Sequence, residues 1–497
     1  MMNDDEQYLE SLGYRQQLFR EMGGFSNFAI SFSIISILTG AVLLYGYGLK
    51  FAGPIVNSIG WPLVSLFTLA VAASMAEIAS AYPTAGGLYF WSLRLGGRGW
   101  AWLTAWLNMI GQVTITGGIN IAAAIYLIGA ATRIFDLQAA FLTNWYFQLA
   151  VMIGILIPQV LINVFGIRLT ARLSDISVWW HIGGVLLIVV ALTVFGKHHN
   201  PAAFLFSFAP SVNAFEASST LVVADVAVPS PLFRLFPSLA ELYRLAPPAL
   251  LFVLALLQAQ WTYTGYDASA HVAEETKMAR LNSAWGIFLS VAVSAVVGYV
   301  MLMVLTWCIP NGDVAATAAD PYPVLYVIAS NLSPFLTNLI AVIIGGAMWL
   351  CGLASVTSMG RMWYAFARDD GMPGSSYLKR VSQNGTPVHA IVVTSILSVL
   401  VCVYAAAFYV VTSISTIALY LAYVIPIFLN LRNRIPRTLA PWSLGPFGPL
   451  INVIAVVWCA VIAVIFMLPP NELVLWTMIA MGLALAVLYR VRRPAAR

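Results

Sequence analysis

Residues 32–42 read Phe32-Ser33-Ile34-Ile35-Ser36-Ile37-Leu38-Thr39-Gly40-Ala41-Val42, an apolar run that contains hydroxyl side chains and a glycine. Residues 258–267 repeat this combination as Gln258-Ala259-Gln260-Trp261-Thr262-Tyr263-Thr264-Gly265-Tyr266-Asp267. A single glycine of this kind can serve only to let two helices pack closely, with Ser and Thr bonded back to the preceding turn. Two of them, five apolar runs apart, predict two helices that are interrupted inside a membrane.

The composition of the chain excludes a soluble globular protein. Its 497 residues are 61% hydrophobic and only 9% charged, whereas soluble domains are about 45–50% apolar and about 25% charged. The net charge of +5 comes from basic residues scattered at the ends of apolar runs, so it indicates membrane orientation and no nucleic-acid partner. The first 25 residues are acidic and lack the basic start of a cleavable signal peptide.

Twelve apolar runs follow one another along the chain. Each is long enough for a membrane-spanning helix, and none shows the short alternating pattern of a barrel strand. We therefore predict an all-α polytopic membrane protein with 12 transmembrane helices. The runs cover residues 26–52, 60–82, 100–131, 145–166, 174–196, 248–272, 283–309, 336–365, 388–407, 409–430, 448–468 and 472–491.

The charge distribution predicts how these helices are oriented. If both termini are cytoplasmic, 19 of the 24 Lys and Arg residues lie on the inner side of the membrane. The five on the outer side are Lys50, Arg133, Lys197, Arg234 and Arg244. We therefore expect an integral protein of the cytoplasmic membrane with both termini in the cytoplasm.

The domain organisation follows from this orientation. Residues 4–22 are expected to form a helix lying along the membrane, and Phe233–Leu245 a second surface helix. The predicted parts are a cytoplasmic N-terminal segment (1–25), a single transmembrane domain (26–491) with an extracellular loop at 197–247, and a cytoplasmic tail (492–497).

An interrupted helix exposes backbone N–H groups that attract an anion and carbonyl groups that attract a cation. Two interruptions side by side therefore form a site for both ends of a zwitterion. Such a break is tolerated in lipid only where it lines a space enclosed by protein. The two breaks predict an internal cavity near the middle of the membrane.

Four further motifs stand out along the chain. They are Gly24-Phe25-Ser26-Asn27-Phe28-Ala29-Ile30-Ser31-Phe32-Ser33, Ala76-Glu77-Ile78-Ala79-Ser80-Ala81-Tyr82-Pro83-Thr84-Ala85-Gly86-Gly87-Leu88-Tyr89, Gly265-Tyr266-Asp267-Ala268-Ser269-Ala270-His271 with Glu274-Glu275-Thr276, and Arg368-Asp369-Asp370-Gly371-Met372-Pro373. Together they resemble the motifs of the amino acid–polyamine–organocation (APC) superfamily, and most closely those of its bacterial and fungal amino acid and choline transporters. With the number and spacing of the apolar runs, the resemblance covers roughly residues 15–490. It implies a 5+5 inverted repeat with interrupted helices 1 and 6, two additional helices, and alternating access around a midplane site.

The resemblance also implies where a substrate carboxylate binds. Leu38, Thr39 and Gly40 would present backbone N–H groups and the Thr39 hydroxyl to it. Many relatives have a glycine where this chain has Leu38, so this side chain narrows the pocket at that point.

The opposite end of the substrate is assigned in the same way. Carbonyl groups of Thr262, Tyr263 and Thr264, beside Gly265, would bind its ammonium group. Trp261 lies where relatives place an aromatic gate over the substrate. Packing within an apolar helix is the alternative role for this side chain.

Charged side chains inside a span are costly, so they normally face a cavity or a partner. Asp267 matches a position where some relatives carry a proton-sensing acid, and a helix cap is its alternative role. Glu77 is expected near the inner end of the second span, where pairing with an arginine would close an inner gate. His181 is a third candidate for proton coupling, although a lone histidine in a helix is often a packing residue.

Sodium coupling is the alternative to proton coupling. Related folds bind Na+ with carbonyls of the first span and hydroxyls of the eighth. Ser355, Thr357 and Ser358 form such a possible sodium site, but Ala354 stands where Ser or Thr is usual. The fifth span lacks the lysine that mimics sodium in some proton-coupled members. The coupling ion is left open among proton symport, exchange and sodium symport, in that order.

We predict a secondary active transporter (permease) for a small amino acid or related amine, such as 4-aminobutyrate, choline or a polyamine. An enzyme is not expected, because the five His residues are dispersed along the chain. The four Cys residues lie far apart in apolar positions, so no metal or other cofactor is indicated. A channel, which needs a polar stripe along several helices, and a nutrient-sensing receptor of the same fold are the alternatives.

Overall fold

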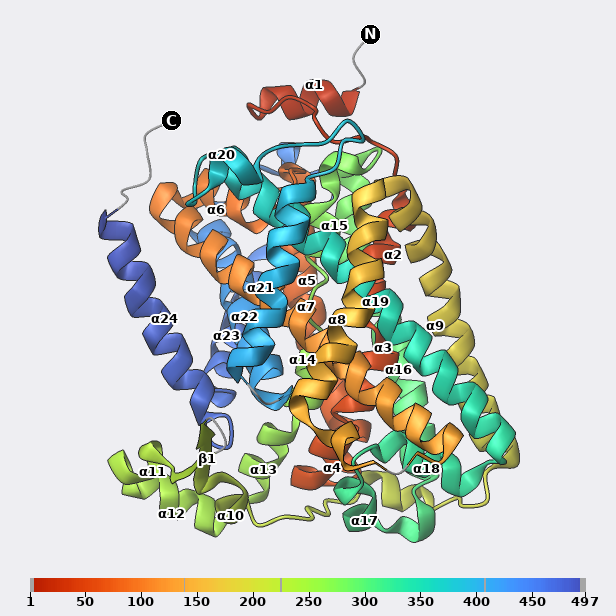
Figure 1. Ribbon diagram of the computed structural model, residues 1–497. Helices are drawn as coiled ribbons and strands as arrows, with labels where there is room; N and C mark the ends of the chain where they lie inside the picture. The colour runs from red at the N-terminus through yellow and green to blue at the C-terminus, as the bar shows by residue number, and fades with distance from the viewer. Residues whose placement is uncertain (1–3, 138, 224–225, 406–407, 492–497) are drawn as a thin grey trace.

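Long apolar helices form a bundle in the computed structural model, which describes residues 4–137, 139–223, 226–405 and 408–491 (Figure 1). The helices of the bundle are α2 (Gly24–Ile35), α3 (Ile37–Leu43), α4 (Tyr45–Ala52), α5 (Trp61–Ala81), α7 (Arg98–Phe135), α8 (Trp145–Phe165), α9 (Ile167–Phe195), α13 (Pro248–Ala255), α14 (Leu257–Thr262), α15 (Ala268–His271), α16 (Ala279–Trp307), α19 (Pro334–Arg368), α21 (Val388–Ala405), α22 (Phe408–Arg432), α23 (Gly448–Ile465) and α24 (Glu472–Val491).

Short elements cover the two ends of this bundle. We call the end that carries α1 and α6 the inner end, following the predicted orientation, and the opposite end the outer end. The short helices are α1 (Asp4–Ser11), α6 (Leu88–Gly96), α10 (Ala214–Ser218), α11 (Pro231–Leu235), α12 (Pro237–Leu245), α17 (Val314–Ala319), α18 (Pro323–Asn331) and α20 (Ser375–Leu378). Single turns lie at Val56–Gly60, Ala140–Thr143, Ala202–Phe206, Ala273–Glu275, Pro310–Gly312, Arg437–Leu439 and Gly445–Phe447.

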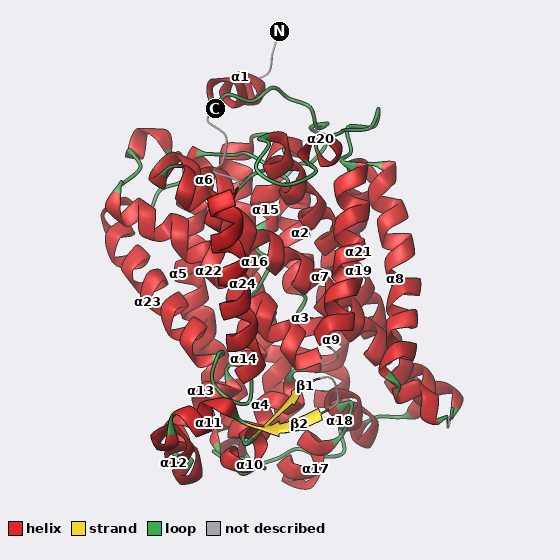
Figure 2. Ribbon diagram, turned by 60° about the vertical axis from the view of Figure 1, so that its left-hand side comes forward, coloured by secondary structure: helices red, strands yellow, loops and turns green. Residues whose placement is uncertain are grey.

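The all-α fold class is confirmed, with one small exception. Ten helices in the described part of the chain are long and apolar enough to cross a membrane. Of the two other predicted spans, one is the interrupted sixth and the other is α21, which is shorter. The count of 12 therefore stays a prediction. The exception is an antiparallel pair of strands, β1 (Thr220–Val223) and β2 (Val226–Pro229), in a segment where no strand was predicted (Figure 2).

The direction of the helices agrees with an inverted repeat. The chain runs from the inner to the outer end in α7, and from the outer to the inner end in its counterpart α19 (Figure 1). The same reversal holds for α5 and α16. Helices α5 and α16 pack against each other, as do α7 and α19. Each of these four helices also packs against a part of one of the interrupted helices.

The first interruption lies three to four residues before the predicted position at Thr39 and Gly40. The helix breaks at Ser36, which has a left-handed backbone (φ 32°, ψ 85°), and both Thr39 and Gly40 lie inside α3. A non-glycine residue in this conformation is strained and needs local compensation. The Ser36 hydroxyl provides it by hydrogen bonding to Thr39 Oγ1 (2.6 Å) and His181 Nε2 (2.8 Å).

The second interruption lies where the sequence predicts it. Helix α14 ends at Thr262, and α15 begins at Ala268 after five residues without regular structure. Gly265 has φ +84°, and a Cβ there would lie 2.3 Å from Ile34 Cγ2. Only glycine satisfies both the backbone conformation and this close approach of the two broken helices.

The predicted helix over residues 4–22 is wrong beyond Ser11. Gly13, with φ +98°, ends the helical stretch. The following residues are not helical, and Met22 pairs with Thr276 through a parallel bridge. The Arg20 guanidinium donates to the carbonyls of Ala273 and Thr276. This segment is therefore bound to the inner end of the bundle.

The predicted surface helix Phe233–Leu245 is two helices. Helix α11 ends before Phe236 and α12 begins at Pro237. The residue before a proline avoids the helical conformation, and Phe236 has φ −128° and ψ 80°. This part of the 197–247 segment lies at the outer end of the bundle (Figure 1).

Candidate functional site

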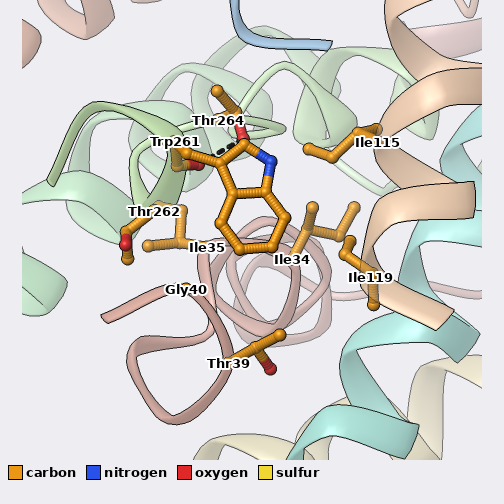
Figure 3. Close-up of a pocket in the computed structure, with 9 residues that line it drawn as sticks. All are labelled: Ile34, Ile35, Thr39, Gly40, Ile115, Ile119, Trp261, Thr262 and Thr264. Atoms are coloured by element: carbon orange, nitrogen blue, oxygen red, sulfur yellow. Dashed lines mark hydrogen bonds between the residues drawn. The ribbon is translucent and has the colours of Figure 1, made fainter. Parts of the chain in front are cut away.

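A narrow cavity of about 10 Å³ lies between the two interrupted helices (Figure 3). This volume is close to the ~10–15 Å³ that one water molecule needs and far below the ~300–1,000 Å³ of ligand pockets. The cavity is therefore nearly closed in this conformation, and it must widen to hold a substrate. No charged side chain is among the described residues that line it. The lining residues are Ile34, Ile35, Thr39, Gly40, Ile115, Ile119, Trp261, Thr262 and Thr264.

The first broken helix contributes Thr39 and Gly40 to this cavity. A Cβ on Gly40 would lie 2.5 Å from Thr262 Oγ1 and 2.8 Å from Thr262 Cα. Gly40 therefore lets α3 and α14 approach within van der Waals distance. The N–H groups of Thr39 and Gly40 both donate to the Ser36 carbonyl (2.8 and 3.0 Å), so a bound carboxylate must share or replace these hydrogen bonds.

Leu38, the third predicted residue on this side, does not line the cavity. It is fully buried and faces α9, where a Cβ on Gly184 would lie 3.1 Å from Leu38 Cδ1. Its side chain therefore fills space between α3 and α9. In this structure the side chain does not narrow the cavity.

His181 connects α9 to the first break. Its Nδ1 lies 2.7 Å from the Ser177 carbonyl oxygen, which can only accept a hydrogen bond, so Nδ1 carries a proton. In the neutral ring Nε2 is then an acceptor, and the Ser36 hydroxyl donates to it. Thr39 in turn donates to Ser36, since the single Ser36 hydrogen is already used. His181 thus holds the backbone conformation of Ser36.

Thr262 and Thr264 of the second broken helix line the cavity. In the described part of the chain, the Thr262 and Thr264 carbonyl oxygens accept no hydrogen bond. The Tyr263 carbonyl accepts one from the Tyr420 hydroxyl (2.7 Å). The Tyr263 ring points away from the cavity, where its hydroxyl meets Ser65 (2.7 Å). Two of the three predicted carbonyls are therefore available to an ammonium group.

Trp261 occupies a central position in the cavity. Its indole ring lies across the middle of the lining residues, between Thr264 and the isoleucines of α2 and α7 (Figure 3). The indole N–H donates to Ser415 Oγ on α22 (3.2 Å). This position next to the cavity is compatible with the predicted gate.

Asp267 lies outside the lining of the cavity, in a fully buried polar cluster. Its Oδ2 accepts hydrogen bonds from Asn108 (3.0 Å) and Gln112 (2.9 Å) on α7, and lies 3.0 Å from His271 Nε2. Its Oδ1 accepts from the Tyr423 hydroxyl on α22 (2.8 Å). The carboxylate makes no capping bond to the N-terminus of α15, so the alternative role of a helix cap is not seen.

The same cluster is tied to the second break and to the inner end. The Gly265 N–H donates to the Tyr423 hydroxyl (3.1 Å). His271 Nδ1 lies 3.1 Å from the Ala85 carbonyl, in the loop between α5 and α6. The cluster therefore joins α15 to α7, to α22 and to this loop.

Glu77 lies at the inner end of α5, as the sequence predicts. Its carboxylate accepts hydrogen bonds from the Ser443 hydroxyl (2.9 Å) and the Leu444 N–H (3.0 Å). Within the described ranges it forms no ion pair with an arginine. Its contacts hold the loop between α22 and α23 against α5.

The three hydroxyls of the possible sodium site do not converge on one point. Ser355 bonds to Thr116 (2.7 Å), Thr357 to Asn163 (2.7 Å) and Ser358 to Gln112 (3.3 Å). The contact of α19 with the first break is instead made by Cys351, whose thiol donates to the Ile34 carbonyl (3.3 Å).

Two buried ion pairs close the inner end of the bundle. Arg368 binds Glu274 through two hydrogen bonds (2.8 and 2.9 Å), and Arg361 binds Glu275 through two (2.9 and 3.1 Å). Both pairs join α19 to the turn that follows α15. Bidentate pairs of this kind fix geometry as well as charge.

Asp369, just beyond the end of α19, adds a third contact at the inner end. Its carboxylate accepts from the hydroxyls of Tyr14 (2.6 Å) and Tyr89 (2.9 Å). Burial raises the pKa of the Asp369 carboxyl, while the Tyr14 hydrogen bond and Arg368 act in the opposite direction. The segment after α1 is in this way part of the closed inner end.

The structure brings five predicted residues together at the cavity, namely Thr39, Gly40, Trp261, Thr262 and Thr264. Sequence reasoning missed the isoleucine walls, because apolar residues in an apolar helix carry no distinguishing signal. It also missed Asn108, Gln112 and Tyr423 as partners of Asp267. The i, i+4 spacing of Asn108 and Gln112, and of Asp267 and His271, was a usable signal.

Nothing in the described residues forms a group of three or more His, Cys, Asp and Glu side chains that could hold a metal ion. The four cysteines are buried and unpaired with one another. The chemistry that this site offers is reversible binding, through hydrogen bonds, backbone dipoles and one buried carboxylate–imidazole pair.

Comparisons with known proteins identify the family. A family model described as amino acid permease matches residues 22–489. An amino-acid permease BAT1 homolog of Oryza sativa subsp. japonica is 33% identical, over 93% of this chain and 87% of the relative. Amino-acid permease BAT1 of Arabidopsis thaliana is 32% identical, over 94% and 89%. The thiamine transporter thi9 of Schizosaccharomyces pombe is 26% identical, over 89% and 76%. This chain therefore belongs to the amino acid permease family of the APC superfamily, and it is an integral membrane transporter of amino acids or related compounds, not an enzyme.

Proposed function

We propose that this chain is a secondary active transporter that moves a small zwitterionic amino acid across the cytoplasmic membrane by alternating access, with protons as the coupling ion. The observation that carries this proposal is the small cavity between the two broken helices. Thr39 and Gly40 of the first broken helix line one side of this cavity. Thr262 and Thr264, whose carbonyls accept no hydrogen bond in the described part of the chain, line the other.

The cavity favours a zwitterion over a cationic amine. A net charge buried without a partner is costly, and the described lining residues provide no carboxylate to neutralise one. A zwitterion is neutral overall, and its two ends match the two breaks. Choline and polyamines carry net positive charge and fit less well. Ile34, Ile115 and Ile119 suit a short apolar side chain or a short methylene chain such as that of 4-aminobutyrate.

Alternating access requires that the inner and outer ends open in turn. The inner end is closed here by the Arg368–Glu274 and Arg361–Glu275 pairs. The two glutamates follow the second break in the sequence, so a movement of the break would displace them. The breaks at Ser36 and Gly265 supply hinges at which the half-helices can tilt. The basic residues support an arrangement in which this end faces the cytoplasm.

Proton coupling is supported by Asp267, a buried carboxylate at the last residue of the second break, two residues after Gly265. Exchange without net proton movement is the alternative. Sodium coupling has less support, because Ser355, Thr357 and Ser358 are each bonded to a different side chain.

Counterflow in proteoliposomes tests the proposal. Vesicles loaded with an unlabelled small amino acid should take up the labelled amino acid in a saturable manner, and choline or spermidine should compete weakly. An inward proton gradient should drive accumulation, and replacing Na+ by K+ should leave it unchanged. Absence of counterflow for every zwitterion would contradict the transport proposal, and a strict Na+ requirement would contradict its coupling part.

A further inference from the structure

The hydrogen bonds of His271 determine how many protons the buried cluster holds. The Ala85 carbonyl can only accept, so His271 Nδ1 must carry a proton. His271 Nε2 lies 3.0 Å from Asp267 Oδ2, and this contact also needs a proton on one of the two atoms. Whether that second proton belongs to an imidazolium or to a carboxylic acid, the pair holds two protons and has no net charge.

We propose that the Asp267–His271 pair binds the coupling proton of the transport cycle, and that the proton shared by Asp267 and His271 keeps the inner end of the bundle closed. This inference rests on the proposed amino acid transport and assigns its coupling site. His271 acts on the gate through its contacts and does not touch the substrate cavity.

Loss of the shared proton changes the cluster in two ways. Nε2 and Oδ2 become two facing acceptors, which repel each other. The pair also gains a net negative charge in a site where both side chains are fully buried. Both effects favour separation of the two side chains, with the proton passing to water on the inner side.

Separation of the pair would release the contacts that close the inner end. His271 is bonded to the Ala85 carbonyl, and the Ala85 N–H donates to Glu274 (2.9 Å). Glu274 in turn holds Arg368 of α19. A continuous chain of contacts therefore leads from the proton to the ion pairs of the inner end. By linkage, opening the inner end must lower the affinity of the pair for its proton.

The neighbours of the pair are either uncharged or already paired with an opposite charge, so the proton is exchanged at the pair itself. From α7, Asn108 and Gln112 face it with uncharged amides, and from α22 the Tyr423 hydroxyl donates to it. The charged groups that follow it along the chain are Glu274 and Glu275. Each is already neutralised by an arginine of α19, Arg368 and Arg361 respectively.

His271→Gln in the full-length protein tests the assignment. Glutamine keeps a donor toward Asp267 but cannot carry the proton. We expect accumulation driven by a proton gradient to fall at least about tenfold, while counterflow at equal pH on both sides stays within about threefold of wild type. His389→Gln, at the inner end of α21, is the matched control and should leave both assays unchanged.

The outcomes separate this inference from the proposed function. No counterflow by the wild type would refute amino acid transport itself. Wild-type counterflow that no proton gradient can drive, or proton-driven accumulation that survives in His271→Gln, would refute the pair as the coupling site. Loss of gradient-driven accumulation alone supports it.

A second measurement does not depend on how His271→Gln folds. Thr84→Cys places a thiol beside Ala85 in the loop that the pair holds, and the native cysteines are buried. Its labelling from the inner side, normalised to the same thiol in denatured protein, should rise several-fold from pH 5.5 to pH 8 because the unprotonated pair releases the loop. A normalised rate that is independent of pH would overturn the proposal.

Discussion

The two interrupted helices differ in length and in charge. The first is broken at one residue, Ser36, whose contacts are the uncharged Thr39 and His181. The second is open over five residues, and Asp267, the last of them, forms a buried carboxylate–imidazole pair with His271. The two breaks occupy equivalent positions in the two halves of the fold, but only the second contains an ionisable side chain.

This difference indicates a division of roles between the two breaks. The first break has little freedom and borders the cavity closely, as a binding surface requires. The second is longer, glycine-containing and connected to the inner end, as a moving gate requires. We therefore expect changes at the first break to affect substrate affinity, and changes after the second to affect coupling. The following variants test that separation.

Gly40→Leu should have the largest effect. The new side chain would enter the space of the Thr262 backbone, 2.8 Å from its Cα, and force α3 and α14 apart. We expect uptake to fall at least about a hundredfold, since a displacement of ~1 Å in positioning groups can cost that much. Gly154→Leu on α8 is the control, because no atom lies within 4 Å of a Cβ there. Wild-type uptake by Gly40→Leu, with normal insertion, would place the site elsewhere.

Asp267→Asn should affect coupling more than binding. An asparagine cannot ionise, and its amide N–H can donate to His271 Nε2 as the shared proton does. We expect proton-driven accumulation to fall about tenfold or more with a smaller loss of counterflow. Uptake against external pH measures this, with Asp175→Asn on α9 as control. A variant that keeps both its rate and its pH dependence would remove Asp267 from the coupling site.

Trp261→Ala should reduce transport by about tenfold, because the indole fills the centre of the cavity and such aromatic contacts contribute ~1 kcal/mol or more. Trp179→Ala should have little effect, because Trp179 lies on the exposed face of α9, away from the cavity, and 67% of the residue is exposed. Initial rates at equal expression compare the two. Equal losses would leave only a packing role for Trp261.

His181→Gln should have the smallest effect of the four. It weakens the support of Ser36, and the loss of one hydrogen bond of about 1 kcal/mol corresponds to roughly fivefold in apparent affinity. The pH dependence of transport should remain. If it disappears while that of His271→Gln remains, the roles assigned to the two breaks must be exchanged.

The sequence predicts the class of fold well because the signals are collective. Twelve apolar runs, the paired glycine motifs and the basic residues at run ends each agree with the helical bundle that the structure shows. The position of the second break is also predicted, since Gly265 is the residue that its backbone conformation requires.

Other features depend on contacts between distant residues and could not be predicted. Ser36 has no propensity for a left-handed conformation, and the break is located there because His181, 145 positions away, meets its hydroxyl. Asn108 and Gln112 are two of several polar residues in α7, and only the packing of α7 on α15 directs them to Asp267. Leu38 was assigned to the pocket through the family resemblance, by its position in the first span, whereas its side chain in α3 faces α9.

The central claim is that a small amino acid binds between the two breaks. Ile119→Cys places a thiol on the α7 wall of the cavity that Thr39 and Trp261 also line, and the native cysteines are buried. Its labelling by a small thiol reagent should be blocked in a saturable way by the transported amino acid, with half-protection at the concentration that half-saturates counterflow. Labelling that is unaffected by saturating concentrations of a transported amino acid would contradict the claim.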